Sequence, residues 1–484
     1  MIILGTNSIK DTGFDVANSL RFNSGSSDYL TKGSLGTGST TKATFSVWIK
    51  KSKLSPSQDI YSLYLDNDNQ LRLRLRDNGA ITIYISLSNS TVVEKRSTLL
   101  LGDFSAWYHV VLVTDLTESA AENKYKIYIN NVKITSYAVN TNTSATSYDN
   151  IVAGGGSYVM HLGSNGQHGD NFYSGYMAEV VHIDGQALNP TSFGEFDEDS
   201  GIWKPIDVSG LTFGTNGFYL DFEDSSALGN DKAGSNNFTV GNLTAIDQST
   251  DTCTNNFATL NPLDNLSSAA TFSEGNTTVA STNSGRGIMT ATFGLTSGKW
   301  YWEVKNSASG GTHASDEWNH IGIANRPGSN TDNILAESGT NSNKVYEYTY
   351  YAYDGNHYNN GDQGGYGASF TTNDIIGVLL DLDNNKIYWS KNGAWADGSG
   401  NSDENDPNGF KAVTDPASTP GGFYFPACSD GGINVSKTWQ WNFGGTPGFA
   451  VSSGNADPNG YGNFEYPTEG AYAICSKNLA EFGG

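Results

Sequence analysis

The chain has 484 residues, a formal net charge of -23 and a charged fraction of only 16 %. Its length allows two to four domains, and its aromatic content of 12 % is too high for a disordered chain. The acidic balance repels phosphate backbones, which argues against nucleic-acid binding. The three cysteines, Cys253, Cys428 and Cys475, are far apart and provide neither a disulfide framework nor a paired zinc motif.

The N-terminal stretch MIILGTNSIKD contains only a few apolar residues and no basic residue before them. A signal peptide is therefore not expected. No segment approaches the roughly 20 apolar residues that a membrane-spanning helix needs. We expect synthesis in the cytoplasm and no insertion into a membrane.

Apolar and polar residues alternate with the period of a β-strand over residues 43–52. Residues 60–88, 106–117 and 123–134 also predict strands joined by turns, and residues 173–196 predict a buried strand, a turn and a short helical turn after Pro190. Turn residues inside 60–88 predict two hairpins in series. Arg72, Arg74 and Arg76 alternate there with leucines. A strand with one solvated face accounts for these arginines, and an anion site is the alternative.

The motifs SLRFNSGSSDYL, FSVWIK, WYHVVLVTD, KIYINNVKI and GYMAEVVHIDGQAL follow one another in this half. In this order they resemble the strands of a laminin-G-like, concanavalin-type jelly roll over about residues 19–196. The resemblance implies two curved antiparallel sheets with loops along one rim. Such modules often bind calcium through rim acids. Asp66, Asp68 and Asp170 are the candidates, but no spacing singles them out, so no metal site is assigned.

A second set of motifs begins near Gly298: GKWYWEVK, HIGIAN, GVLLDLDNNKIYWSKNGAW, FYFPACS and WQWNFGG. Their order and spacing resemble a SPRY domain, which is also a bent β-sandwich. The predicted fold class is therefore all-β, with two concanavalin-like antiparallel sandwiches in tandem and an irregular connector between them. The predicted boundaries are an N-terminal attachment segment 1–18, a laminin-G-like domain 19–200, the connector 201–283, a SPRY domain 284–447 and a C-terminal segment 448–484.

Asp381 and Asp383 stand two residues apart before Asn384 and Asn385, a pattern that raises the question of a metal loop. An EF-hand loop that began at Asp381 would need Gly and Glu where the chain has Lys386 and Asn392. Carboxylates in an exposed turn also gain no raised pKa for glycosidase chemistry. The stretch predicts a hairpin turn.

Catalytic patterns are incomplete. Some concanavalin-type sandwiches are glycoside hydrolases with an E-x-D-x-x-E strand, and the nearest match here, Glu195 and Asp197, ends in Ser200 and follows a helical turn. The chain has no HExxH pair, no G-x-S-x-G and no phosphate loop. We expect no enzymatic activity and no cofactor.

Aromatic residues in Gly/Asn/Asp-rich loops are the candidate binding residues, because sugar faces stack on exposed rings. The stretch HASDEWNH holds Trp318 and His320, and YAYDGNHYNNGDQGGYG holds Tyr353, His357, Tyr358 and Tyr366. Asp316 and Asp354 would flank this aromatic patch and accept sugar hydroxyls. The alternative is that the rings close the end of the sandwich.

The order of the two modules, the stretch GTNGFYLDF between them and the closing FEYPTEGAYAICSKNLAEF resemble structural proteins of tailed bacteriophages. The resemblance implies a virion location, as a tail fibre, capsid fibre or similar appendage that adheres to host-surface glycans. It also implies other virion proteins as partners and a homo-oligomer, such as a trimer. The alternatives are a capsid decoration protein without a ligand, a glycan-degrading enzyme on the same fold and a bacterial surface adhesin.

Overall fold

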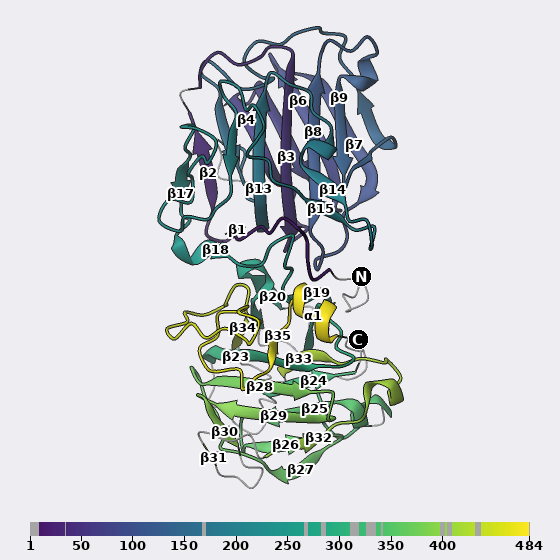
Figure 1. Cartoon of the computed structure of the whole chain (residues 1–484), viewed down its shortest axis with the longest axis vertical. Coiled ribbons are helices and arrows are strands. Elements are labelled where there is room, and N and C mark those ends of the chain that lie inside the picture. Colours follow the sequence, from purple (N-terminus) through teal and green to yellow (C-terminus); the bar gives the residue numbers. More distant parts are fainter. Residues whose placement is uncertain are drawn as a thin grey trace. The chain divides into compact units, whose positions relative to one another are not determined.

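The computed structural model describes residues 9–33, 35–166, 171–265, 270–281, 287–309, 319–325, 335–339, 342–396, 402–403, 409–430 and 437–483. The chain divides into two compact units (Figure 1). The N-terminal unit is Thr12–Thr254, and the C-terminal unit consists of Met1–Asp11 and Asn255–Gly484. Each unit contains two large, almost entirely antiparallel sheets, so the predicted all-β fold class with two sandwiches is confirmed.

The first sheet of the N-terminal unit, sheet 1, follows an order that brings distant segments together. Its strands, from one edge to the other, are β10 (Val132–Lys133), β9 (Tyr125–Ile129), β8 (Tyr108–Asp115), β3 (Lys42–Lys51), β13 (Gly175–Asp184), β1 (Ser19–Phe22) and β18 (Gln248–Ser249), with β16 (Phe218–Leu220) beside β13. A separate pair, β14 (Gly194–Phe196) and β15 (Trp203–Pro205), lies on the same unit.

The second sheet of this unit, sheet 2, is built mainly from consecutive hairpins. Its order is β11 (Tyr137–Thr141), β7 (Ser90–Leu100), β6 (Ala80–Leu87), β5 (Asn69–Leu75), β4 (Gln58–Asp66), β12 (Val159–Leu162), β2 (Tyr29–Lys32) and β17 (Thr239–Gly241). The predicted hairpins within 60–88 are β4–β5 and β5–β6. Short 3-10 turns lie at Ala121–Asn123, Pro190–Ser192 and Ala245–Asp247.

The core between these sheets follows from the two-residue period of the strands. Phe45 and Val47 of β3 and Leu71 and Leu73 of β5 belong to one buried apolar cluster. The alternate residues of β5, Arg72 and Arg74, therefore face away from the core.

Segments of irregular structure cover the outer face of sheet 1. Phe193 and Val208 pack on Val111 and Val181, and a neighbouring cluster holds Trp48, Trp107, Tyr176 and Trp203. Val16 belongs to the second cluster, and its backbone N–H donates to Thr254 Oγ1 at 3.0 Å. Part of the predicted attachment segment 1–18 is thus built into this unit.

In the C-terminal unit, sheet 3 has the order β19 (Leu260–Asn265), β22 (Gly287–Ala291), β33 (Phe425–Asp430), β24 (His320–Ala324), β25 (Tyr348–Tyr351), β26 (Asn356–Tyr358) and β27 (Asp362–Gly365). Sheet 4 has the order β20 (Thr271–Ser273), β21 (Thr278–Ser281), β34 (Lys437–Asn442), β23 (Lys299–Ser309), β28 (Ile375–Asp381), β29 (Lys386–Lys391), β30 (Ala394–Ala396) and β31 (Ser402–Asp403). β32 (Lys411–Ala412) pairs with β29, and β35 (Tyr472–Ala473) pairs in parallel with β23. Remaining turns of helix are Glu274–Asn276, Ser342–Tyr346, Pro416–Ser418 and α1 (Ser476–Phe482).

The inner faces of sheets 3 and 4 enclose a core rich in tryptophan. Trp300, Trp302, Trp389, Trp439 and Trp441 are all fully buried. The C-terminal segment packs on the outer face of sheet 4, where Phe464 and Cys475 join Tyr301 of β23 in a further cluster. Within the described ranges, no helix is long and apolar enough to cross a membrane.

The predicted connector, 201–283, is not an independent element. β15, β16, β17 and β18 belong to the N-terminal unit, and β19, β20 and β21 belong to the C-terminal unit. Each of these strands has only two to six residues. Their positions depend on pairing with distant strands, and the local pattern gave no sign of that pairing.

Candidate functional site

The predicted aromatic site in the C-terminal unit is largely buried. Trp318 and Asp316 lie outside the described residues. His320 of β24 is fully buried, with its ring stacked on Tyr351 at 4.6 Å between centroids and edge-on to Tyr358 at 4.8 Å. Its Nδ1 lies 2.9 Å from Thr349 Oγ1. Burial lowers the pKa of His320 to about 3, so the ring is neutral at physiological pH.

His357 and Tyr366 lie on the opposite, interior side of sheet 3. Tyr366 is fully buried, packs edge-on against Trp389 and accepts a hydrogen bond from the Trp389 backbone N–H at 2.9 Å. His357 is 7 % exposed and packs near Tyr348 and Trp389. The exposed patch predicted from these rings is therefore wrong for the residues that the structure describes, and the rings seal the sandwich.

The physical reason for this error is the strand period. β25 and β26 send successive residues to opposite faces of sheet 3, so neighbouring aromatics enter two different buried layers. Tyr353, with 49 % of its surface exposed, is the described candidate that remains open to solvent. Asp354 lies beside it and is also exposed.

The hairpin predicted at Asp381 is confirmed. The turn joins β28 to β29. Asp381 Oδ1 accepts the backbone N–H of Asn384 at 3.0 Å, and Asp383 Oδ1 accepts the backbone N–H of Gly298 at 2.8 Å. Asn385 has the positive φ of 55° that such a turn requires.

The incomplete E-x-D-x-x-E match lies partly in a strand, contrary to the sequence-based expectation, because Glu195 is the middle residue of β14. Lys204 lies 3.6 Å from Glu195 and 3.3 Å from Asp197. Hydrogen bonds from Ser200 and the nearby Lys204 lower the pKa of Asp197 to about 2. A general acid in glycoside hydrolysis needs a raised pKa, so this arrangement does not provide one.

Two buried acids do have raised pKa values, which the sequence did not indicate. Burial raises the pKa of Glu179 to about 8, with Tyr219 donating to its Oε2 at 2.8 Å. Burial raises the pKa of Glu303 to about 7, although the backbone N–H groups of Glu465 and Tyr466 donate to it. The two acids lie in different units, and the Glu303 carboxylate holds the C-terminal segment on sheet 4.

Asp66, Asp68 and Asp170 were the candidates for the calcium binding that the laminin-G-like resemblance implies, without a site being assigned, and Asp170 lies outside the described residues. Asp66 and Asp68 stand in the β4–β5 turn, where Asp66 Oδ1 accepts the Asp68 backbone N–H at 2.9 Å. In the described part of the chain, no group of three or more His, Cys, Asp or Glu side chains could hold a metal ion.

A different surface gathers polar and aromatic side chains: the outer side of sheet 2, which we call the polar face. Cross-strand register places its members on one side of the sheet. They are Tyr29 of β2, His161 of β12, Asp59, Ser62 and Tyr64 of β4, Arg72 and Arg74 of β5, Tyr84 of β6, and Glu94 and Arg96 of β7.

The centre of the polar face is an ion-pair cluster. Asp59 has a fully buried side chain that contacts both Arg72 and Arg74. Arg72 Nε donates to Asp59 Oδ1 at 3.1 Å, and its Nη2 also donates to Oδ2. Arg74 Nε lies 3.2 Å from Oδ1, while Arg74 Nη2 donates to Asn171 Oδ1 at 3.1 Å. Both guanidinium groups are therefore held in fixed orientations.

Aromatic rings border this cluster on one side. The Tyr29 ring lies 6.4 Å from the His161 ring and 6.3 Å from the Phe172 ring, between centroids. Tyr29 and Phe172 are partly exposed, whereas His161 is 7 % exposed. Burial lowers the pKa of His161 to about 4, so this ring is neutral.

The other side of the polar face carries Tyr84, Glu94 and Arg96, which are all partly exposed. Tyr84 stands directly across from Arg72 on β5 and from Glu94 on β7. Arg96 Nη2 lies 3.9 Å from Glu94 Oε1. The polar face thus offers oriented donors, carboxylate acceptors and ring surfaces, which are the groups that bind sugars.

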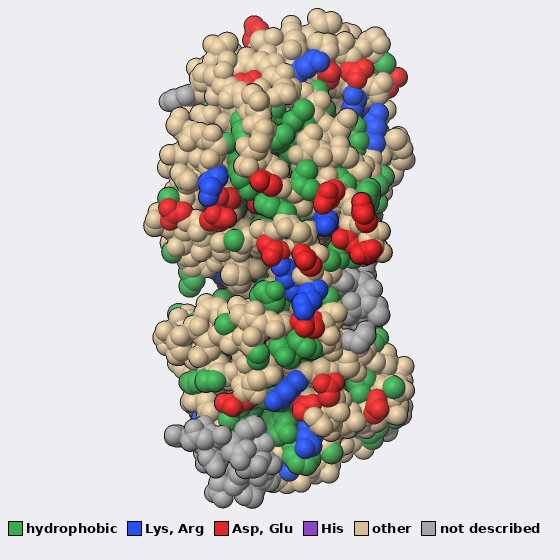
Figure 2. All heavy atoms as spheres, in the orientation of Figure 1, with side chains coloured by type: hydrophobic (Ala, Val, Ile, Leu, Met, Phe, Trp, Pro, Cys, Tyr) green, Lys and Arg blue, Asp and Glu red, His purple; other side chains and the backbone are tan. Residues whose placement is uncertain are grey.

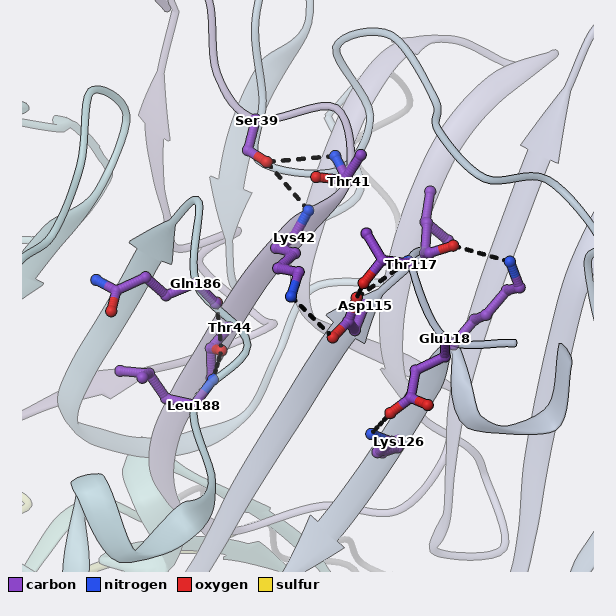
Figure 3. A network of polar contacts seen from close by, with 12 residues as sticks. Ser39, Thr41, Lys42, Thr44, Asp115, Thr117, Glu118, Lys126, Gln186 and Leu188 are labelled. Carbon is purple, nitrogen blue, oxygen red and sulfur yellow. Dashed lines mark hydrogen bonds and ion pairs between the residues drawn. The ribbon is translucent and has the colours of Figure 1, made fainter. Parts of the chain in front are cut away.

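Sheet 1 carries a polar network of another kind, where β3 begins and β8 ends, shown in Figure 3. Lys42 Nζ lies 3.3 Å from Asp115 Oδ2, Lys126 Nζ donates to Glu118 Oε1 at 2.7 Å, and Asp115 also accepts from Thr117. These bonds close loops between neighbouring strands. Each carboxylate in the network has a lysine partner, so these ion pairs stabilise the ends of the strands locally.

Two family models match the chain, in the predicted order. Residues 24–192 match the concanavalin A-like lectin/glucanases superfamily, and residues 299–409 match the SPRY domain. The chain therefore contains a concanavalin-like domain followed by a SPRY domain. No curated protein matches the chain.

Solved structures of both kinds are similar in part. The SPRY domain of human HERC1 is 20 % identical, with 38 % of this chain and 96 % of that chain covered and a TM-score of 0.29. A putative carbohydrate-binding protein from Bacteroides ovatus is 17 % identical, with 47 % and 60 % covered and a TM-score of 0.33. A pentraxin from Limulus polyphemus is 14 % identical, with 36 % and 80 % covered and a TM-score of 0.25.

Proposed function

We propose that the chain is a non-catalytic carbohydrate-binding protein, and that the polar face of sheet 2 is its binding surface. The observation that carries this proposal is the Asp59–Arg72–Arg74 cluster between aromatic side chains. Asp59, whose side chain is fully buried, orients the guanidinium groups of Arg72 and Arg74. These guanidinium groups and the partly exposed Glu94 carboxylate exchange hydrogen bonds with sugar hydroxyls, and the rings of Tyr29 and Tyr84 contact sugar faces. The match to a superfamily of lectins and glucanases supports the same class of ligand.

Binding without catalysis is favoured by the state of the acids. Asp197 is ionised, and Glu179 has Tyr219 as a partner on sheet 1, away from the polar face. Asp59 on the polar face has two arginine partners and no neighbouring carboxyl group with a raised pKa among the described residues. A pair of acids with opposite protonation states is what glycoside hydrolysis needs.

The biological setting of the proposal is a tailed-bacteriophage virion, in which the chain forms part of a fibre or similar appendage and adheres to host-surface glycans. This part of the proposal rests on the resemblance of the sequence motifs to such proteins, and the two family models supply only the order of the concanavalin-like and SPRY modules. A homo-oligomer in contact with other virion proteins suits this role, since repeated weak sites raise avidity about 10²–10⁴-fold. Labelling of purified particles with an antibody against the chain tests the location, and unlabelled particles would contradict it.

Binding is tested on immobilised bacterial surface polysaccharides with the wild-type chain and two variants. Tyr84→Ala removes a ring from the polar face and should weaken binding several-fold, whereas Tyr353→Ala, in the C-terminal unit, should leave it unchanged. The same samples are assayed for released reducing sugar, and we expect none. If Tyr353→Ala abolishes binding and Tyr84→Ala leaves it unchanged, the binding site lies in the C-terminal unit. Release of reducing sugar in proportion to the concentration of the chain would show that the chain hydrolyses the polysaccharide and would contradict the non-catalytic role.

A further inference from the structure

Positive charge is in surplus on the central strands of the polar face. Arg72, Arg74 and Arg96 bring three guanidinium groups there, and Asp59 and Glu94 bring two carboxylates. Asp66 and Asp68 stand at one end of the face, in the β4–β5 turn near Tyr64. This surplus stands on a chain whose formal net charge is -23. Positive residues are the minority on this chain, so their concentration on one surface indicates a negatively charged partner.

Arg72 and Arg74 are less exposed than the strand with one solvated face predicted from the sequence. The side chains of Arg72 and Arg74 are only 11 % and 15 % exposed, and that of Arg96 is 33 % exposed. The Nε atom of Arg96 is buried without a hydrogen-bond partner. Partly buried guanidinium groups in fixed orientations lose little entropy when an anion binds, and water screens the attraction less than at an open surface.

The side of the N-terminal unit that carries β14 and β15 is rich in negative charge. Figure 2 shows acidic side chains gathered on the side that carries β14 and β15. Glu195, Glu198, Asp199 and Asp207 are exposed there. An anionic ligand is repelled by this side, so charge alone distinguishes the two faces of the unit.

We infer that the ligand of the polar face is an acidic polysaccharide, whose carboxylate, sulfate or phosphate groups bind Arg72, Arg74 and Arg96. This inference rests on the proposed carbohydrate-binding function and adds the chemical class of the sugar. Arg72 and Arg74 form the fixed part of the site. Arg96, with a looser contact to Glu94 of 3.9 Å, turns toward the anion when the ligand binds.

The test compares matched pairs of polymers: polygalacturonate, alginate and hyaluronate, each beside its carboxyl-reduced form. The full chain is titrated against each polymer by affinity electrophoresis. We expect at least one acidic polymer to bind more than tenfold more tightly than its reduced form, with affinity falling as salt rises. Equal or tighter binding of the reduced forms would overturn the inference and leave the carbohydrate-binding function standing. Binding of no polymer in either form would overturn both.

Three variants test whether the anionic groups of the ligand bind at the polar face. Arg74→Gln should weaken binding of the acidic polymer at least tenfold, and Arg96→Gln several-fold, because Arg96→Gln leaves both partners of Asp59 in place. Lys126→Gln removes one positive charge from sheet 1 and should change affinity less than twofold. Thermal melting checks the fold of each variant. If Lys126→Gln weakens binding as much as a folded Arg96→Gln, the effect is one of overall charge and the assigned site is wrong.

Discussion

The indole of Trp203 donates a hydrogen bond from Nε1 to Nδ1 of His109 at 3.0 Å. Because Nδ1 accepts this bond, the proton of the neutral ring lies on Nε2, which donates to Ser46 Oγ at 2.8 Å. Burial lowers the pKa of His109 to about 3, in keeping with a neutral ring. Trp203 thus ties the chain after residue 200 into the N-terminal unit.

This relationship predicts where the N-terminal unit can be cut. A fragment of residues 12–254 should fold and melt cooperatively, whereas a fragment of residues 12–200 should not, since it lacks Trp203, β16 and Asp251. Circular dichroism melting of both fragments gives the answer. A cooperative transition in the shorter fragment would restore residues 201–254 to the role of a connector.

Buried and exposed ion pairs of this unit should differ in their effect on stability. Lys50 Nζ and Asp251 Oδ2 are 2.6 Å apart with side chains 1 % exposed, and Trp107 Nε1 donates to Asp251 Oδ1. Asp251→Asn leaves Lys50 without its counter-charge and should cost about 3–5 kcal/mol. Glu118→Gln, which breaks the partly exposed Lys126 pair in Figure 3, should cost about 0–1 kcal/mol. Urea unfolding measures the loss of stability in both variants. Equal losses would contradict the distinction between the buried and the exposed ion pair.

Glu179 should make the stability of the wild-type chain fall as pH rises. Burial raises its pKa from 4.5 to about 8, so the protonated, folded form is favoured and its contribution is complete below pH 4.5. That contribution is lost as pH rises toward 8, by about 1.4 kcal/mol per pH unit. Glu179→Gln cannot ionise, so its stability relative to wild type should increase between pH 5 and pH 8. A difference that stays constant over this range would show that Glu179 is ionised in the folded chain.

Glu303 should control the attachment of the C-terminal segment. It accepts the backbone N–H groups of Glu465 and Tyr466 at 3.0 and 2.8 Å, and Asn442 Nδ2 at 2.9 Å. Glu303→Ala leaves these buried and partly buried donors without an acceptor and should cost about 3–5 kcal/mol. Hydrogen exchange should accelerate first at residues 464–466. Unchanged exchange there would mean that the apolar contacts of Phe464 hold the segment alone.

Much of the fold could be predicted because it depends on local patterns. The Asp381–Asn385 turn and the alternating Leu and Arg of β5 specify strands and hairpins directly. The short strands after residue 200 could not be predicted, because β16 and β18 pair with β13 and β1, which lie far away in the sequence. Non-local pairing leaves no periodic signal in strands of two or three residues.

The candidate site was harder to predict for a related reason. The β4–β5 hairpin contains register shifts between Tyr64 and Asp66 and between Asp59 and Tyr61. A regular count from the turn would place Ser62 opposite Leu73, whereas the structure pairs Ser62 with Arg72 and Asp59 with Arg74. The arginines were visible in the sequence, but their shared carboxylate depends on these bulges. The aromatic loops, by contrast, suggested a surface that strand pairing buries.

Hydrogen exchange with and without a bound polysaccharide tests the central claim most directly, because it maps the bound surface on the intact chain. We expect slower exchange in β2, β4, β5, β6, β7 and β12, which form the polar face, and little change in β25, β26 and β27. Protection confined to the Tyr353 hairpin or to the β14–β15 side, with the polar face unchanged, would contradict it.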